Sequence, residues 1–299
     1  MRRALVAILA TGAFACGTSS TPSGFGNPDG SVATPDGSSG DDDGGPIPCL
    51  CLPDGSLGVP DGSPTTNQVA IVYGESPDTL YALDPLTKAV TVVGAFSGGC
   101  SGVEDIALDK DSNMYGTTSA ALYKIDRATA VCTLIKNGTY PNSLSFVPAG
   151  TLDPNVEALV GYNAGNYVRI DPTTGVVTTV GAIGGGFSSS GDIVSVKGGS
   201  TYLTVTGTGC SAEDCLIEVN PTTGALVKNW KSVAHNQVFG LSFWAGSLYG
   251  FDNGGDLFEI DLTNGVLTTK TIPVPNPPAG LEFWGAGSTT SAPVTPPPK

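Results

Sequence analysis

One short phrase recurs five times along the chain, and each copy has the pattern of a strand, a tight polar turn and a second strand. The clearest copy of the turn reads Asp-Pro-Thr-Thr-Gly, in which the first side chain can cap backbone amides, proline fixes φ, and glycine accepts a positive φ. The phrase therefore predicts a repeated β-hairpin. The five turns begin at Asp84, Asp126, Asp171, Asn220 and Asp261, spaced 42, 45, 49 and 41 residues apart.

The spacing of these hairpins predicts a β-propeller. A period of 40 to 50 residues holds about four strands, which is the length of one propeller blade. Two further strand-like segments precede most of the hairpins, for example VEDIAL around Ile106 and NMYGTT after it. We therefore expect an all-β fold with five blades, or with six if the long stretch 144–220 contains one more.

The two ends of the repeat region predict how the ring closes. The first repeat begins at QVAIVYG, which resembles the second strand of a blade, with no first strand before it. The segment AGLEFWGAG follows the last complete repeat and matches FGLSFWAGS, so that Trp284 would correspond to Trp244 and Phe283 to Phe243. We expect this C-terminal strand to complete the N-terminal blade, because closure removes exposed strand edges. The aromatic pairs predict packing between blades, with a platform for sugar rings as the alternative.

Composition divides the chain into four predicted parts. Residues 1–16 resemble an export signal, and Ala13-Phe14-Ala15-Cys16 resembles a lipobox in which Cys16 carries the lipid, with an ordinary cleavage site as the alternative. Residues 17–66 contain four copies of PDGS and no Lys or Arg, which predicts a disordered acidic tether rather than a calcium-binding repeat. Residues 67–288 are the predicted propeller, and residues 289–299 a predicted disordered tail.

The charge of the chain excludes some classes of partner. The net charge is −14, whereas nucleic acids and anionic membranes are bound by clustered Lys and Arg. We therefore expect no nucleic-acid partner, and contact with a membrane only through the lipid anchor. We also expect the protein to be a monomer.

The seven cysteines indicate an oxidising compartment. Assigning Cys16 to a lipid leaves six, which can pair. We predict two disulfides inside the propeller, Cys100 with Cys132 and Cys210 with Cys215. Cys49 and Cys51 form C-x-C, for which a small disulfide and a free pair both stay open; with no nearby His or further Cys this is a weak pattern for a metal site.

Polar side chains gather at or just before the first strand of the predicted blades, where they would face the ring axis. The candidate ligand-binding residues are Glu104, Asp105, Asn142, Asp192, His235 and Gln237. Carboxylate oxygens suit Ca²⁺, so Glu104, Asp105 and Asp192 are candidate metal ligands in the axial channel. The alternative is that these groups satisfy backbone amides at the strand ends. No other cofactor and no catalytic residue is predicted, since His235 is the only histidine and no G-x-S-x-G motif occurs.

The repeats resemble those of bacterial surface propellers of the YVTN and NHL-like kind, and the N-terminal part resembles that of a bacterial envelope lipoprotein. The resemblance implies an exported protein that is lipid-anchored at the cell envelope. Propellers host unrelated activities, so function depends on the site. We expect no enzyme but a surface module that binds an envelope protein or a glycan through one propeller mouth. The alternatives are a sensor domain for calcium or a small ligand, and a hydrolase similar to propeller lactonases.

Overall fold

The computed structural model of the protein describes residues 50–51, 57–58 and 72–295. The described residues fall into two units, one within residues 1–63 and one within residues 64–299. In the first unit, β1 (Leu50–Cys51) pairs antiparallel with β2 (Leu57–Gly58). The predicted signal with Cys16, most of the predicted tether, and Cys49 lie outside the described residues. Within the described ranges, no helix has the length and hydropathy needed to cross a membrane.

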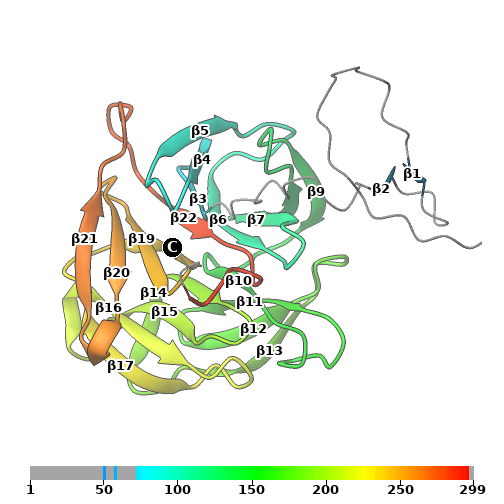
Figure 1. The fold of residues 1–299 in the computed structure, drawn as a ribbon. Coiled ribbons are helices and arrows are strands. Elements are labelled where there is room, and N and C mark those ends of the chain that lie inside the picture. The colour runs from blue at the N-terminus through cyan, green and yellow to red at the C-terminus, as the bar shows by residue number, and fades with distance from the viewer. Residues whose placement is uncertain (1–49, 52–56, 59–71, 296–299) are drawn as a thin grey trace, which may run out of the picture. The chain divides into compact units, whose positions relative to one another are not determined.

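The second unit consists of five antiparallel sheets of four strands each, arranged as the blades of a propeller (Figure 1). Blade 1 contains β22 (Gly285–Gly287), β3 (Val72–Glu75), β4 (Thr79–Leu83) and β5 (Val90–Ala95). Blade 2 contains β6 (Val103–Leu108), β7 (Met114–Thr118), β8 (Ala121–Ile125) and β9 (Cys132–Asn137). Blade 3 contains β10 (Leu144–Val147), β11 (Ala158–Asn163), β12 (Asn166–Ile170) and β13 (Val177–Ala182).

The remaining two blades are longer. Blade 4 contains β14 (Phe187–Ser195), β15 (Thr201–Gly207), β16 (Cys210–Val219) and β17 (Leu226–Ser232). Blade 5 contains β18 (Val238–Trp244), β19 (Ser247–Asp252), β20 (Leu257–Asp261) and β21 (Thr268–Ile272), with a short 3₁₀ turn η1 (Thr263–Gly265). The stretch 144–220 thus holds blade 3 and the first three strands of blade 4, and the five-blade prediction is confirmed. The stretch 144–220 is long because β14 and β16 have nine and ten residues.

The first strand of each blade is innermost and touches the first strands of the two neighbouring blades, in the order β22, β6, β10, β14, β18 and back to β22. The predicted closure is confirmed, because β22 from the C-terminal region pairs with β3. The predicted alignment of that strand is wrong. Ala286 stands opposite Gly74, as Leu241 stands opposite Gly250 in blade 5, so Ala286 and not Leu281 corresponds to Leu241.

The predicted hairpin turns form as the sequence indicates. In blade 3, Oδ1 of Asp171 accepts the amides of Thr173 and Thr174 at 2.8 and 2.9 Å, and Gly175 has φ of 70°. The same Asx capping recurs at the other four turns. These turns also join neighbouring blades, because the Tyr167 hydroxyl donates to the Pro221 carbonyl in the turn of blade 4 at 2.9 Å.

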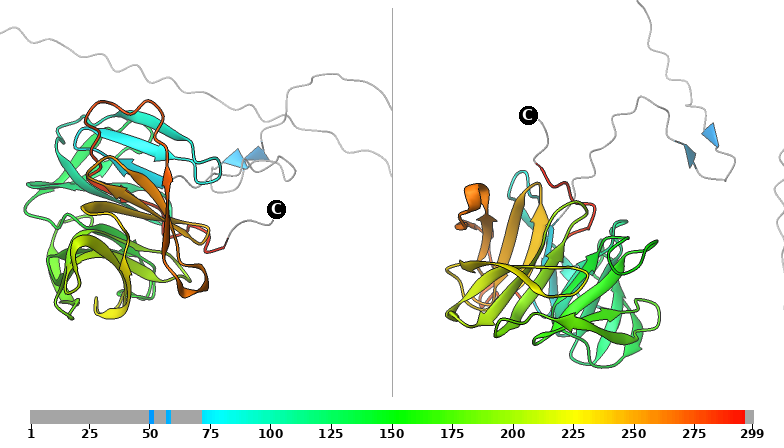
Figure 2. Two further views of the ribbon diagram at one scale, coloured as in Figure 1. Left: turned by 90° about the vertical axis from the view of Figure 1, so that its left-hand side faces the viewer. Right: turned by 90° about the horizontal axis from the view of Figure 1, so that it is seen from below.

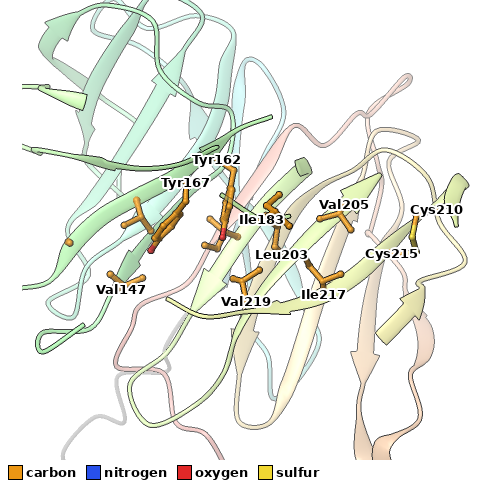
Figure 3. Packing of buried hydrophobic residues seen from close by; sticks show 13 residues of the cluster. Val147, Tyr162, Tyr167, Ile183, Leu203, Val205, Cys210, Cys215, Ile217 and Val219 are labelled. Atoms are coloured by element: carbon orange, nitrogen blue, oxygen red, sulfur yellow. A yellow bond between two sulfur atoms is a disulfide. The ribbon is translucent and has the colours of Figure 1, made fainter. Parts of the chain in front are cut away.

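Apolar side chains fill the space between adjacent blades. Figure 3 shows the largest such cluster, in which Tyr162 and Tyr167 of blade 3 pack toward Leu203 and Ile217 of blade 4. Both tyrosines are fully buried. Burial of this kind supplies most of the stabilisation of a sheet protein and fixes the angle between blades.

Both predicted propeller disulfides are present. The bond between Cys100 and Cys132 joins the segment before β6 to β9 of the same blade. The bond between Cys210 and Cys215 lies within β16, where the pairing with β15 shifts register between Val205 and Gly207. The four residues between these two cysteines are therefore part of an irregular strand.

A C-terminal segment, residues 288–294, crosses the end of the ring at which the innermost strands finish. The Thr289 hydroxyl donates to the Asp109 carbonyl of blade 2 at 2.8 Å, and the Thr290 hydroxyl donates to Glu157 of blade 3. The Lys197 amide of blade 4 donates to the Thr290 carbonyl at 2.9 Å, and the Ala245 amide of blade 5 donates to Pro293 at 2.7 Å. Figure 2 shows this segment in red at one end of the ring. Residues 289–294 of the predicted disordered tail are thus part of the segment that crosses the ring, and residues 296–299 lie outside the described residues.

Candidate functional site

The strand pairing places one residue of each innermost strand at the same height on the ring axis. The five equivalent residues, called the axial level here, are Gly285, Asp105, Ser143, Asp192 and Gly240. All five are buried. Two of the predicted site residues, Asp105 and Asp192, therefore face a common centre. Ser143, which shares this level, has a buried hydroxyl with no hydrogen-bond partner among the described residues.

The two axial aspartates join neighbouring blades through backbone amides. Asp105 accepts the amide of Ile106 in its own strand at 2.8 Å and, through its other oxygen, the amide of Leu144 in blade 3 at 2.5 Å. Asp192 does the same with Ile193 in its own strand at 2.6 Å and Leu241 in blade 5 at 2.7 Å. Satisfying buried amides of the innermost strands is close to the structural role that the sequence analysis gave as the alternative to metal binding, although of these amides only that of Leu144 begins its strand.

Glu75 lies beside these aspartates and was missed by sequence reasoning. It ends β3 directly opposite Gly285, it is fully buried, and neither carboxyl oxygen has a hydrogen-bond partner among the described residues. A Cβ atom placed on Gly285 would stand 2.1 Å from Oε1 of Glu75 and 2.4 Å from Oδ1 of Asp105. One signal in the sequence was a lone glutamate at the end of an apolar strand, where the other four blades carry Thr, Tyr, Thr and Phe.

The environment disfavours charge on all three carboxyl groups. Burial raises the pKa of Glu75 well above its usual range, and the nearby Asp105 carboxyl raises that pKa further. Burial likewise raises the pKa of Asp105 and of Asp192, against the opposing effect of the backbone amides that donate to each. The nearby Asp192 carboxyl raises the pKa of Asp105 further. Glu75, Asp105 and Asp192, called the axial carboxyl cluster below, must therefore hold protons or a cation to avoid uncompensated charge.

A hollow of about 420 Å³ opens at the end of the ring where the innermost strands begin, which we call the entry mouth. It is lined by Glu104, Thr139, Tyr140, Pro141, Asn142, Asn163, Phe239 and Trp284. Four of these residues, Glu104, Asn142, Phe239 and Trp284, directly precede a residue of the axial level. The hollow therefore lies over the axis, with the axial carboxyl cluster beneath it.

The polar and aromatic groups of the hollow come from different blades. Glu104 and Asn142, both predicted site residues, meet there with Trp284, which the sequence assigned to packing between blades or to a sugar platform. The rings of Trp284 and Phe239 are half-buried, and the Trp284 indole N–H donates to Glu282 at 3.3 Å. Partial burial raises the pKa of Glu104.

The other two predicted site residues lie apart from the lining of the hollow. His235 Nδ1 is 2.8 Å from Oδ2 of Asp252, and its ring stacks on Phe258 with 3.7 Å between centroids. Gln237 is exposed, and its carbonyl accepts the amide of Asn253 at 3.0 Å. His235, Asp252 and Asp256 offer ligand atoms within 4.8 Å of one another, but Oδ1 of Asp252 already accepts the amides of Gly254 and Asp256.

Comparison with known proteins gives one family match. Residues 156–292 match the model of a family described as a repeat of unknown function, DUF6923. The matched part runs from just before β11 through β22 and into the C-terminal segment. No curated protein matches the chain in sequence.

Several solved structures are similar in fold at low identity. Kuenenia stuttgartiensis hydrazine synthase is 14% identical, with 72% of this chain and 70% of that chain covered and a TM-score of 0.39. A chain of the nidogen/laminin complex is 11% identical, with 73% and 97% covered and a TM-score of 0.45. A gluconolactonase from Xanthomonas campestris is 15% identical, with 58% and 64% covered and a TM-score of 0.41. The chain thus spans slightly less than two thirds of that gluconolactonase.

Proposed function

We propose that the propeller is a non-catalytic binding module that recognises a carbohydrate at the entry mouth. The observation that carries the proposal is the composition of the hollow: half-buried aromatic rings of Trp284 and Phe239 beside Glu104, Asn142 and Asn163. A sugar ring presents an apolar face that packs on an aromatic ring and hydroxyl groups that need carboxylate and amide partners. A few polar groups placed around an apolar wall are typical of a small-ligand site.

The C-terminal segment crosses the end of the ring opposite the entry mouth, and this supports recognition of a ligand from the entry mouth alone. The C-terminal segment hydrogen-bonds to blades 2, 3, 4 and 5 at the end opposite the entry mouth. A chain that threads through the channel would have to displace this segment. A terminal or branching sugar that enters from the entry mouth fits this geometry better.

The use of the carboxyl groups favours binding over hydrolysis. Glycoside hydrolysis generally uses two carboxyl groups on either side of the scissile bond. Among the described residues that line the hollow, Glu104 is the one carboxylate. Asp105, directly beneath it, is buried and holds backbone amides of blades 2 and 3.

A glycan array probed with the full mature chain tests the proposal. We expect selective binding to a set of glycans that share a terminal sugar, and at least a tenfold weaker signal for Glu104→Gln, which keeps the shape of the side chain and removes its charge. Glu218→Gln on β16 is the matched control and should bind like the wild type. Absence of binding to every glycan, with the protein folded, would contradict the proposal and favour a protein partner of the cell envelope.

We further propose that the domain is displayed at the bacterial cell envelope by a lipid on Cys16. The two propeller disulfides fit an extracellular location, and the sequence before residue 17 has the pattern of an export signal. Cys16→Ala should move the protein from the membrane fraction to the soluble exported fraction on cell fractionation. Retention of Cys16→Ala in the membrane fraction would argue against the lipid anchor.

A further inference from the structure

We infer that the carbohydrate recognised at the entry mouth is an amino sugar with a free, protonated amino group, and that the Glu104 carboxylate pairs with this group. The inference rests on the carbohydrate site proposed above and names the class of sugar that the site selects. The hollow at the entry mouth has a volume of about 420 Å³, which lies within the range of cavities that bind small ligands.

The Glu104 carboxylate has lost part of its contact with water and has no partner in the described part of the chain. Burial alone shifts the pKa of Glu104, which rises because the charged form is less well hydrated than in water. By contrast, the buried Asp105 and Asp192 each accept backbone amides. A protonated amine on a ligand would give Glu104 the charged partner that it lacks, in a charge-assisted hydrogen bond.

The aromatic rings beside Glu104 also favour a positively charged ligand group. Trp284 and Phe239 line the same hollow and are half-buried. The face of an aromatic ring attracts an ammonium group that lies within about 6 Å, and the attraction is strongest for tryptophan. The Glu282 carboxylate accepts the indole N–H of Trp284 at 3.3 Å, which adds a second negative charge at the edge of this ring. A sugar that packs on Trp284 would therefore hold its amino group where positive charge is stabilised.

The lining of the hollow disfavours an acidic sugar. Among the described residues that line it there is no Lys, Arg or His, and the other polar side chains, those of Thr139, Tyr140, Asn142 and Asn163, are neutral. The whole chain carries a net charge of −14. The carboxylate of an acidic sugar would meet Glu104 with no cation between them, and an N-acetylated sugar would leave Glu104 without a charged partner. Both effects select against the wrong ligand.

The test is binding of the full mature chain to a glycan array on which each amino sugar is present in its free-amine and its N-acetylated form, including the β-1,4-linked tetramers of glucosamine and of N-acetylglucosamine. The array is probed at about pH 6, below the pKa of about 7.7–8.0 that is usual for an α-amino group. We expect the strongest signals from free amines, and calorimetry should give at least tenfold tighter binding for the best free amine than for its N-acetylated form. Glu104→Gln has the same shape and no charge, so this preference should fall below threefold, whereas Glu218→Gln on β16 should keep it.

Tetralysine has as many side-chain amines as the glucosamine tetramer and no sugar ring, so it separates recognition of an amino sugar from attraction of any cation to an acidic protein. It should bind at least tenfold more weakly than the best amino sugar, and equal binding would overturn the inference. Tighter or equal binding of neutral, acidic or N-acetylated sugars would also overturn it, as would an unchanged preference in folded Glu104→Gln, and in these cases the proposed carbohydrate site would stand. If Glu104→Gln did not fold, the wild-type affinity ratios would decide. Absence of binding to every glycan would instead contradict the proposed function itself, and the inference with it.

Discussion

The carboxyl group of Asp105 holds three innermost strands together, because it accepts amides from Ile106 in β6, Leu144 in β10 and Ala286 in β22. Asp192 repeats the arrangement between blades 4 and 5. Each of these oxygens accepts a backbone amide of an innermost strand that would otherwise need a water molecule, which matters most where the backbone is buried. At the residue scale, the ring is therefore fastened by carboxylates at its axis as well as by apolar packing between its blades.

Asp105→Ala should lower the free energy of unfolding by roughly 2–3 kcal/mol, because it leaves buried amides of three strands without an acceptor. The measurement is urea denaturation in EDTA, so that cation binding does not contribute. Asp111→Ala is the control, since its side chain is 63% exposed and should change stability by less than about 0.5 kcal/mol. Equal stability of the two variants would show that the axial amides do not depend on Asp105.

The turn aspartates make stability depend on acid. The backbone amides of Thr174 and Thr173 hold the pKa of Asp171 below its ordinary value of 3.8. A lowered pKa in the folded state adds stability that is complete above the unfolded pKa and is lost as pH falls through the folded pKa. Asn220 occupies the equivalent place in blade 4 and caps its turn without a charge. Asp171→Asn should therefore keep the turn and lose less stability than the wild type when pH falls from about 5 to 3. Parallel pH curves for the two proteins, from thermal melts, would be the contrary result.

At the scale of the element, the hairpins were predictable because their determinants are local. Asp171 and Gly175 stand within one turn, and the capping they make needs no other part of the chain. The register of β22 could not be predicted from the sequence. The match of Phe283 and Trp284 to Phe243 and Trp244 followed aromatic residues, whereas the pairing is set by small residues that must fit beside Glu75 and Asp105.

Among the residues of the candidate site, those whose place follows from the local repeat pattern were predicted, and those whose place depends on contacts between distant segments were not. Asp105, Asp192, Glu104 and Asn142 were found because the repeat pattern places them at or just before the first strand of a predicted blade. Glu75 was missed because it lies at the end of a second strand and reaches the axis only where β22 contributes glycine. His235 was expected near the axis as a loop residue, but its pairing with Asp252 holds it beside β19 and β20.

At the scale of the whole molecule, the two ends of the propeller sequence meet in one place. Blade 1 takes β22 from the C-terminal region and β3 to β5 from the N-terminal region, so the ring is closed by hydrogen bonds between distant parts of the chain. Residues 288–294 then continue across four other blades. Folding of the domain should accordingly depend on its last residues, since closure is the step that removes open strand edges.

Deletion of residues 288–299 keeps β22 and removes the crossing segment. We expect the melting temperature to fall by about 5–10 °C, because the deletion removes the buried side chains of Thr290 and Ala292 and the hydrogen bonds of this segment to four blades. Differential scanning calorimetry measures this change. Deletion of residues 296–299 alone leaves all of these contacts in place and should shift the melting temperature by less than about 2 °C. Equal melting of both truncated proteins would mean that the crossing segment does not fasten the ring.

The affinity of the entry mouth for carbohydrate can be measured by calorimetry with the strongest glycan from the array, comparing Trp284→Ala with Trp230→Ala. Trp284 lines the hollow over the axis, whereas Trp230 lies on the outer strand β17 beneath Lys228. We predict that Trp284→Ala weakens binding by tenfold or more and that Trp230→Ala binds like the wild type. Equal affinity of Trp284→Ala and the wild type would contradict recognition at the entry mouth.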